Sequence, residues 1–173
     1  MASLEDKFIT AAGLLLEVKT LLVKRKRRDA YQLAARASVR YASDPFLLSY
    51  FGYLEASVEG KYRSGIEACT RAITLFEKKM FRGEDDAEES QMAVLYLNLG
   101  KAYIAAEKKK EAIRTLNAGL KFDRKNRDLM AELEGMGIRK LIPVPFLRRT
   151  NPLNEIIGRM LRKRKGEENR QHA

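Results

Sequence analysis

Small and apolar side chains recur along this chain in one helical pattern, and that recurrence constrains the fold more than any other feature. The pattern starts at Ala30, returns 35 residues later at Gly65, and returns after another 47 residues at Ala112. Three sets of residues carry it: Ala30, Tyr31, Ala34 and Ala37; Gly65, Ile66, Cys69 and Ala72; and Ala112, Ile113, Leu116 and Gly119. Such a period is typical of stacked helical units, each burying the apolar face of its neighbour.

The second interval is longer than the first, and a polar insertion accounts for the difference. Residues 82–90 have the sequence RGEDDAEES, which contains five carboxylates and one glycine. We therefore expect a lengthened loop, or the solvated start of a helix, between two of the repeated units.

Apolar residues within each unit are spaced as on one face of a helix, and no segment alternates as a strand would. Ser43 or Asp44 predicts a cap before Pro45, and Gly60 predicts a break between two helices. We therefore expect an all-α fold with helices over residues 4–24, 28–42, 45–59, 62–81, 88–106 and 109–122. A seventh helix should follow Asn126 and end between Gly135 and Gly137.

Residues that support hydrolytic or metal chemistry are scarce. Cys69 is the only cysteine and His172 the only histidine. One chain therefore cannot assemble a disulfide, a Cys/His zinc site, a Ser-His-Asp triad or a Cys-His dyad. We expect no catalytic residue, no metal and no cofactor. Because Ala34 and Leu116 occupy the matching positions in the other units, Cys69 should be a buried small hydrophobe.

Targeting signals are not evident in the sequence. The most apolar stretch, residues 8–23, is interrupted by Glu17 and Lys19, and it is shorter than the roughly 20 residues of a membrane-spanning helix. Glu5 and Asp6 precede it where a secretory signal carries basic residues. With a single unpaired cysteine, the cytoplasm is the expected compartment.

Residues 93–126 form a 34-residue unit that resembles a tetratricopeptide repeat. Seven signature positions of that family are occupied in order: Tyr96, Leu99, Gly100, Tyr103, Ala112, Leu116 and Gly119. Arg124 stands where the family has its closing proline. A unit that begins near Pro45 resembles the same repeat, and an earlier unit matches it in its second helix, so the resemblance covers residues 11–126.

The resemblance implies a right-handed α-solenoid of about three helix hairpins plus a capping helix, in a domain spanning residues 1–140. It also implies a concave groove, whose residues would be Tyr50, Tyr53, Leu97, Asn98, Lys101 and Ile104. This mixture of apolar and polar side chains suits an amphipathic helix or an extended segment of a protein partner. We therefore expect a non-catalytic adaptor or scaffold that binds a partner protein in the groove.

A basic extension, residues 141–173, follows the helical domain. From Arg139 onward there are ten Lys or Arg and three Asp or Glu, so this part carries +7 of the formal +11. Pro143 and Pro145 favour an extended chain, and Asn151-Pro152 predicts the start of a short amphipathic helix. The basic side of that helix holds Arg159, Arg162, Lys163, Arg164 and Lys165.

Four roles remain open for this tail helix. It could fold back over the helical domain or its groove, dock on anionic lipid, or pair two chains as a homodimer. With the basic residues 24–28 it could also contact nucleic-acid phosphates or an acidic protein. The alternative function is accordingly nucleic-acid or anionic-membrane binding through the tail.

Overall fold

A computed structural model describes residues 10–82 and 88–137, and these residues are helical, with no strand. The chain divides into two units, residues 1–137 and 138–173, and every described residue belongs to the first. The α-helices are α1 (Ala11–Val23), α2 (Arg27–Arg40), α3 (Pro45–Glu59), α4 (Tyr62–Phe81), α5 (Met92–Ala105), α6 (Lys109–Phe122) and α7 (Arg127–Gly135). None of these helices is both long and apolar enough to cross a membrane. The expected all-α class is thus confirmed for the described residues.

Cap and turn residues explain which predicted helix bounds are confirmed. The bounds of α3, α4 and α6 are those expected from the sequence. At the start of α3, Asp44 Oδ1 accepts a hydrogen bond of 2.8 Å from the Leu47 N–H, and Pro45 is the first helical residue. At its end, Gly60 adopts φ of 68°, a left-handed conformation that glycine tolerates best.

Two predicted helix starts are wrong by four or more residues, whereas α2 begins one residue before, and ends two residues before, its expected bounds. Helix α1 was expected from residue 4, but it begins at Ala11, because Thr10 is extended and its Oγ1 accepts a bond of 3.1 Å from the Gly13 N–H. Helix α5 was expected from residue 88, but a short 3-10 turn, Glu89–Gln91, precedes it. Most of the predicted polar loop, residues 83–87, lies outside the described residues.

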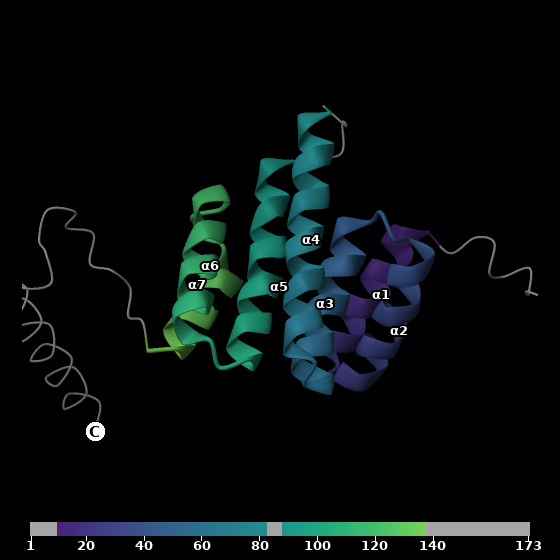
Figure 1. The fold of residues 1–173 in the computed structure, drawn as a ribbon, viewed down its shortest axis with the longest axis horizontal. Coiled ribbons are helices and arrows are strands. Elements are labelled where there is room, and N and C mark those ends of the chain that lie inside the picture. The colour runs from purple at the N-terminus through teal and green to yellow at the C-terminus, as the bar shows by residue number, and fades with distance from the viewer. Residues whose placement is uncertain (1–9, 83–87, 138–173) are drawn as a thin grey trace, which may run out of the picture. The chain divides into compact units, whose positions relative to one another are not determined.

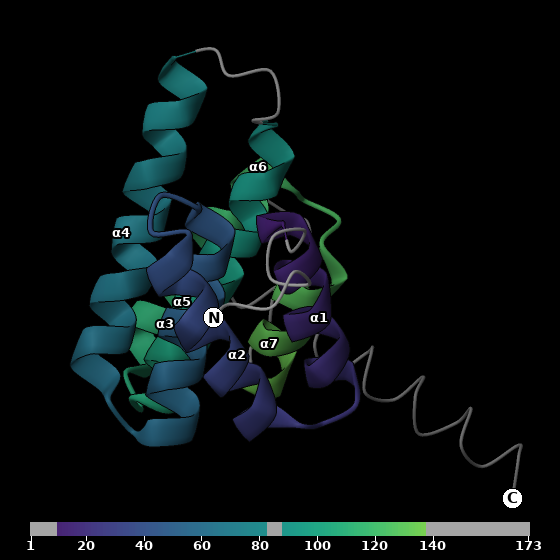
Figure 2. The same cartoon turned by 90° about the vertical axis from the view of Figure 1, so that its right-hand side faces the viewer.

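The helices pack first with their chain neighbours and then with the next pair. Contacts join α1 to α2, α3 to α4 and α5 to α6, and further contacts join α2 to α3, α4 to α5 and α3 to α5. Helix α7 packs on α5 and α6. Within residues 10–137 the helices follow one another in chain order (Figure 1), and Figure 2 shows α4 on one side with α1 and α7 on the other.

The turns inside the three pairs share one backbone geometry. Each holds a residue with positive φ: Arg25 at 60°, Gly60 at 68° and Glu107 at 57°. The next residue is a lysine in each turn, with φ from −86° to −82° and ψ from 65° to 70°: Lys26, Lys61 and Lys108. The amide of each lysine donates to a carbonyl near the end of the preceding helix, at 2.9 to 3.3 Å. These lysines are 35 and 47 residues apart, so the interval found in the sequence also recurs in the backbone.

Helices α3 and α4 come into backbone contact at two glycines. A Cβ added at Gly52 would lie 2.5 Å from the carbonyl oxygen of Gly65, and a Cβ at Gly65 would clash with the carbonyl oxygen of Gly52. Because backbone atoms are involved, no change of side-chain rotamer can make room. Gly100 of α5 plays a related part, since a Cβ there would overlap the side chain of Leu116 in α6.

The main core cluster lies between these helices. It consists of buried residues from α3, α4 and α5: Ala56, Cys69, Ile73, Phe76, Met92, Leu95, Leu99 and Ala102. The predicted burial of Cys69 is confirmed, and burial raises the pKa of its thiol, which donates to the Ser49 carbonyl oxygen at 3.3 Å. Tyr96 and Tyr103, which occupy two of the repeat-signature positions, pack against this cluster and stay partly exposed.

Replacing Gly52 by alanine tests the backbone contact. We expect Gly52→Ala to lower the free energy of unfolding by about 1–3 kcal/mol, the usual cost of overpacking, even though alanine favours helix by about 1 kcal/mol. Gly135→Ala is the control, because no atom of the described residues lies within 4 Å of the added Cβ. Urea unfolding followed by circular dichroism measures both. Equal stability of the two variants would contradict the proposed contact.

Candidate functional site

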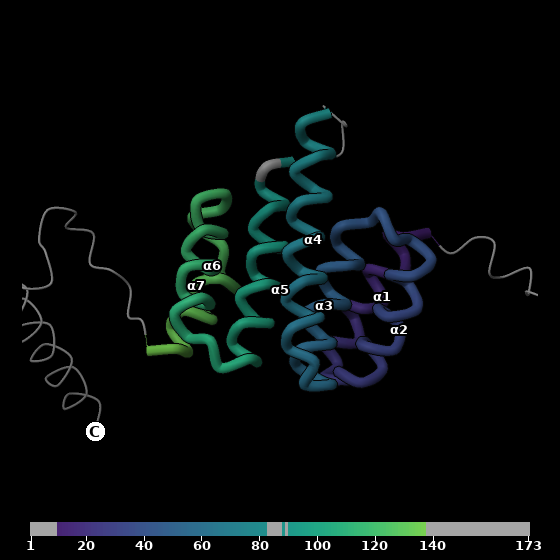
Figure 3. Tube along the Cα trace, viewed as in Figure 1, coloured from purple at the N-terminus to yellow at the C-terminus, as the bar shows by residue number. Residues whose placement is uncertain are grey.

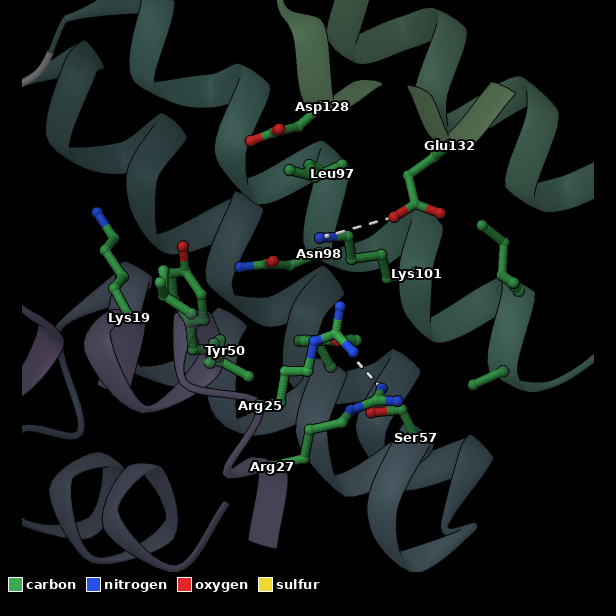
Figure 4. A pocket seen from close by; sticks show the side chains of 15 residues that line it. Lys19, Arg25, Arg27, Tyr50, Ser57, Leu97, Asn98, Lys101, Asp128 and Glu132 are labelled. Carbon is green, nitrogen blue, oxygen red and sulfur yellow. Dashed lines mark hydrogen bonds and ion pairs between the residues drawn. The ribbon is translucent and has the colours of Figure 1, made fainter. Parts of the chain in front are cut away.

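A pocket of about 840 Å³ opens among the odd-numbered helices (Figure 4). Helices α1, α3, α5 and α7 supply most of its lining, and Arg25 and Arg27 at the α1–α2 turn supply the rest. Neither α4 nor α6 contributes a residue. The pocket therefore depends on how three helix pairs and α7 are placed against one another.

All six residues expected in the groove line this pocket. Two come from α3 and four from α5: Tyr50, Tyr53, Leu97, Asn98, Lys101 and Ile104. Packing of α3 against α5 brings them together across more than forty residues of sequence. That a partner binds there stays a prediction.

Two of the six are less available than the sequence suggested. Only 6% of Leu97 and 2% of Asn98 are exposed. The Asn98 Nδ2 donates to Ser49 Oγ at 3.1 Å, so this amide group bonds α5 to α3. A buried amide whose hydrogen bond joins two helices stabilises their packing, and it has little capacity left to bind a ligand. Asn98 is therefore best described as a residue that shapes the pocket wall.

Tyr53 is held between two cations. The Arg27 Nη2 donates to the Tyr53 hydroxyl at 3.1 Å, and the guanidinium carbon lies 5.9 Å from the ring centroid. The Lys101 Nζ lies 5.4 Å from the same centroid and 3.7 Å from Glu132 Oε1. Each cation–ring contact contributes about 0.5–1 kcal/mol at an exposed site. These contacts fix the Tyr53 ring as a rigid part of the wall and join α2, α3, α5 and α7 across the pocket.

Tyr50 is partly buried and interacts with a carboxylate. Burial raises the pKa of its hydroxyl to about 12, and the charge of Asp128 contributes in the same direction, followed by Tyr53. The Lys19 Nζ lies 5.9 Å from the centroid of the Tyr50 ring. Tyr50 thus presents a neutral hydroxyl at neutral pH, with its ring in contact with a cation.

Charge is unevenly distributed around the pocket. Lys19, Arg25 and Arg27 come from α1, the turn and the start of α2, whereas Asp128 and Glu132 come from α7. Figure 4 shows the two arginines on the opposite side of the pocket from the two carboxylates. Within the described residues Lys19 and Arg25 form no ion pair. With Lys101 included, four cations face two carboxylates, so the pocket is cationic.

Sequence reasoning missed this cationic wall. Arg25 and Arg27 belong to the basic run of residues 24–28, but the sequence does not say which of the five side chains faces inward. The turn decides it, because the left-handed conformation of Arg25 reverses the chain there. Sequence reasoning also missed Ser57 in the pocket lining, whose Oγ is buried and has no hydrogen-bond partner among the described residues.

Neither protein-family models nor curated proteins match the sequence. In the part of the chain that the structure describes, no group of three or more His, Cys, Asp or Glu side chains could hold a metal ion. The predicted cationic residues of the tail lie outside the described residues: Arg159, Arg162, Lys163, Arg164 and Lys165. Their role on an anionic surface stays a prediction.

The raised pKa of Tyr50 has a measurable consequence at high pH. An unfolded tyrosine ionises near pH 10, whereas the folded Tyr50 ionises near pH 12. The raised pKa therefore favours the folded state below pH 10, and this contribution is lost as the pH rises to 12. We expect NMR titration of the tyrosine rings to show a transition near pH 12 that Tyr50→Phe removes.

Asp128→Asn separates the two main causes of the Tyr50 shift. It should lower the pKa of Tyr50 while leaving it above 10, because burial is the larger cause. A Tyr50 transition near pH 10 in the unaltered protein would contradict the burial of its hydroxyl.

Proposed function

We propose that this protein is a non-catalytic adaptor of the tetratricopeptide-repeat type, whose pocket binds a segment of a partner protein. The observation that carries the proposal is the convergence of all six predicted groove residues on one pocket. A preformed wall of this kind binds with little loss of conformational entropy on the protein side.

The right-handed α-solenoid belongs to the same proposal. It is supported by three pairs of helices with equivalent turns at Arg25, Gly60 and Glu107. It is further supported by the close contact of Gly52 with Gly65, since small residues let the two helices of a pair approach closely.

The chemistry of the pocket favours an amphipathic partner segment that carries carboxylates. Tyr50, Tyr53 and Ile104 offer aromatic and aliphatic surface, which suits apolar side chains of the partner. Lys19 and Arg25, which form no ion pair within the described residues, suit its carboxylates. The carboxylates of α7 would repel an acidic segment and so favour one orientation in the pocket.

Binding rather than catalysis is part of the proposal. The buried Cys69 thiol has a raised pKa, so it is a poor nucleophile. The alternative function, binding of an anionic surface or nucleic acid by the tail, concerns residues outside the described ones and remains a prediction.

A charged side chain placed in the pocket tests how much the apolar lining contributes to peptide binding. Peptides are selected on the full-length chain from a random display library, and their affinities are measured by fluorescence anisotropy. Ile104→Arg places a long cation among the apolar side chains and should weaken binding at least tenfold, about 1.4 kcal/mol. Val39→Arg is the matched control, because Val39 is 81% exposed on α2 and does not line the pocket. Equal binding by the two variants would contradict the proposal.

Charge reversal tests the cationic wall with the same peptides. Arg25→Glu and Lys101→Glu should each weaken acidic peptides at least tenfold, because a carboxylate then faces the ligand. Arg36→Glu makes the same change of charge at an exposed position of α2 outside the pocket, and it should leave affinity unchanged. Thermal unfolding checks that all variants fold. Retention of every selected peptide by both pocket variants would count against this site.

A further inference from the structure

One end of the helical array is basic. The turns α1–α2, α3–α4 and α5–α6 all lie at the lower edge of residues 10–137 in Figure 1, and also in Figure 2, which is turned about the vertical axis. The tube in Figure 3 shows the same placement. We name the residues of these turns, 24–29, 59–63 and 107–111, the turn edge.

Charge is concentrated on this edge. Its three segments hold ten Lys or Arg and four Asp or Glu, whereas the other described residues hold thirteen and eleven. The equivalent lysines Lys26, Lys61 and Lys108 are exposed and do not line the pocket. Of the cations on the edge, Arg63 forms an ion pair, with Glu67 at 2.9 Å. The turn edge is therefore a second cationic surface, which shares Arg25 and Arg27 with the pocket and carries +6 of the formal +8 on the described residues.

Exposed apolar side chains accompany these cations. Val23, the last residue of α1, is 84% exposed, and Tyr62, the first residue of α4, is 46% exposed. Val23 immediately precedes Lys24 of the turn edge, and Tyr62 lies within the edge, directly after Lys61. Water is a poor environment for such groups, whereas the boundary between lipid headgroups and acyl chains accepts both apolar side chains and the amphipathic tyrosine ring.

We propose that the turn edge docks on a membrane surface that contains anionic lipid. Each lysine or arginine close to such a surface contributes substantially to binding, and the contribution falls off within a Debye length. Nucleic acid also carries phosphates, but its backbone offers no apolar surface for Val23. Tyr62 is the only aromatic residue within the edge, so the edge provides one side chain at most for base stacking. The inference needs no ligand in the pocket, although Val23, Arg25 and Arg27 belong to both surfaces. It extends beyond the proposed binding of a partner segment.

Reversal of the three equivalent lysines tests the proposal. The full-length chain is sedimented with vesicles of phosphatidylcholine alone and of phosphatidylcholine with phosphatidylserine. We expect binding to the mixed vesicles only, and we expect Lys26→Glu, Lys61→Glu and Lys108→Glu together to weaken it by about 100-fold or more. The same positions changed to glutamine should weaken it less, and they provide a milder variant should the reversal disturb folding.

The control makes the same change of net charge elsewhere. Arg36, Arg71 and Lys121 are exposed on the second helix of each pair. They lie at least nine residues beyond the start of their helices, about 14 Å along the axis, which exceeds the Debye length of about 8 Å at physiological salt. Their joint reversal to glutamate should leave most of the vesicle binding intact.

The outcomes separate the edge from other surfaces. Equal loss in the two triple variants would overturn the proposal, because net charge alone would then account for binding. Unchanged binding in the lysine variant would also overturn it, since the basic tail would be sufficient. A wild-type chain that binds duplex DNA but neither vesicle would show that nucleic acid is the ligand. A further loss in Val23→Ser with Tyr62→Ser, on vesicles but not on DNA, would support insertion of the apolar side chains.

Discussion

The approach of α3 to α4 at two glycines is the constraint on which the rest of this structure depends. Where Gly52 meets Gly65, the backbones are so close that a Cβ at either position would force the two helices apart. That closeness seals the cluster around Cys69 and Phe76. It also fixes α3 in the place from which Tyr50 and Tyr53 reach the pocket.

Pairing of the helices has one consequence within each turn and another over all the described helices. Locally, equivalent turns place one lysine each after a residue with positive φ. Over the whole described array, every pair turns at the same end, so modest local charges add up to one basic edge while the odd-numbered helices enclose the pocket. Neither surface requires an unusual residue, and both follow from repetition of one unit.

Much of the fold could be predicted from short-range signals. Asp44, Pro45 and Gly60 act through their own backbone geometry, so the bounds of α3 followed from the sequence. The start of α1 could not be predicted as well, because the apolar pattern continues through residues 8–10 and only the cap at Thr10 ends the helix there. The burial of Asn98 escaped prediction because it depends on Ser49, a partner 49 positions away. The inward position of Arg25 depends on the turn conformation, which the run of five basic residues does not specify.

The α1–α2 turn serves two surfaces at once. Arg25 and Arg27 line the pocket, whereas Lys24, Lys26 and Arg28 are exposed outside it, although all five are consecutive in sequence. A change of length or conformation in this run would therefore alter which cations line the pocket and which lie on the turn edge, so it would disturb both surfaces. The turns at Lys61 and Lys108 contribute nothing to the pocket lining. Substitutions in the α3–α4 and α5–α6 turns would therefore affect the turn edge alone, whereas substitutions in the α1–α2 turn would have to preserve both the turn edge and the pocket.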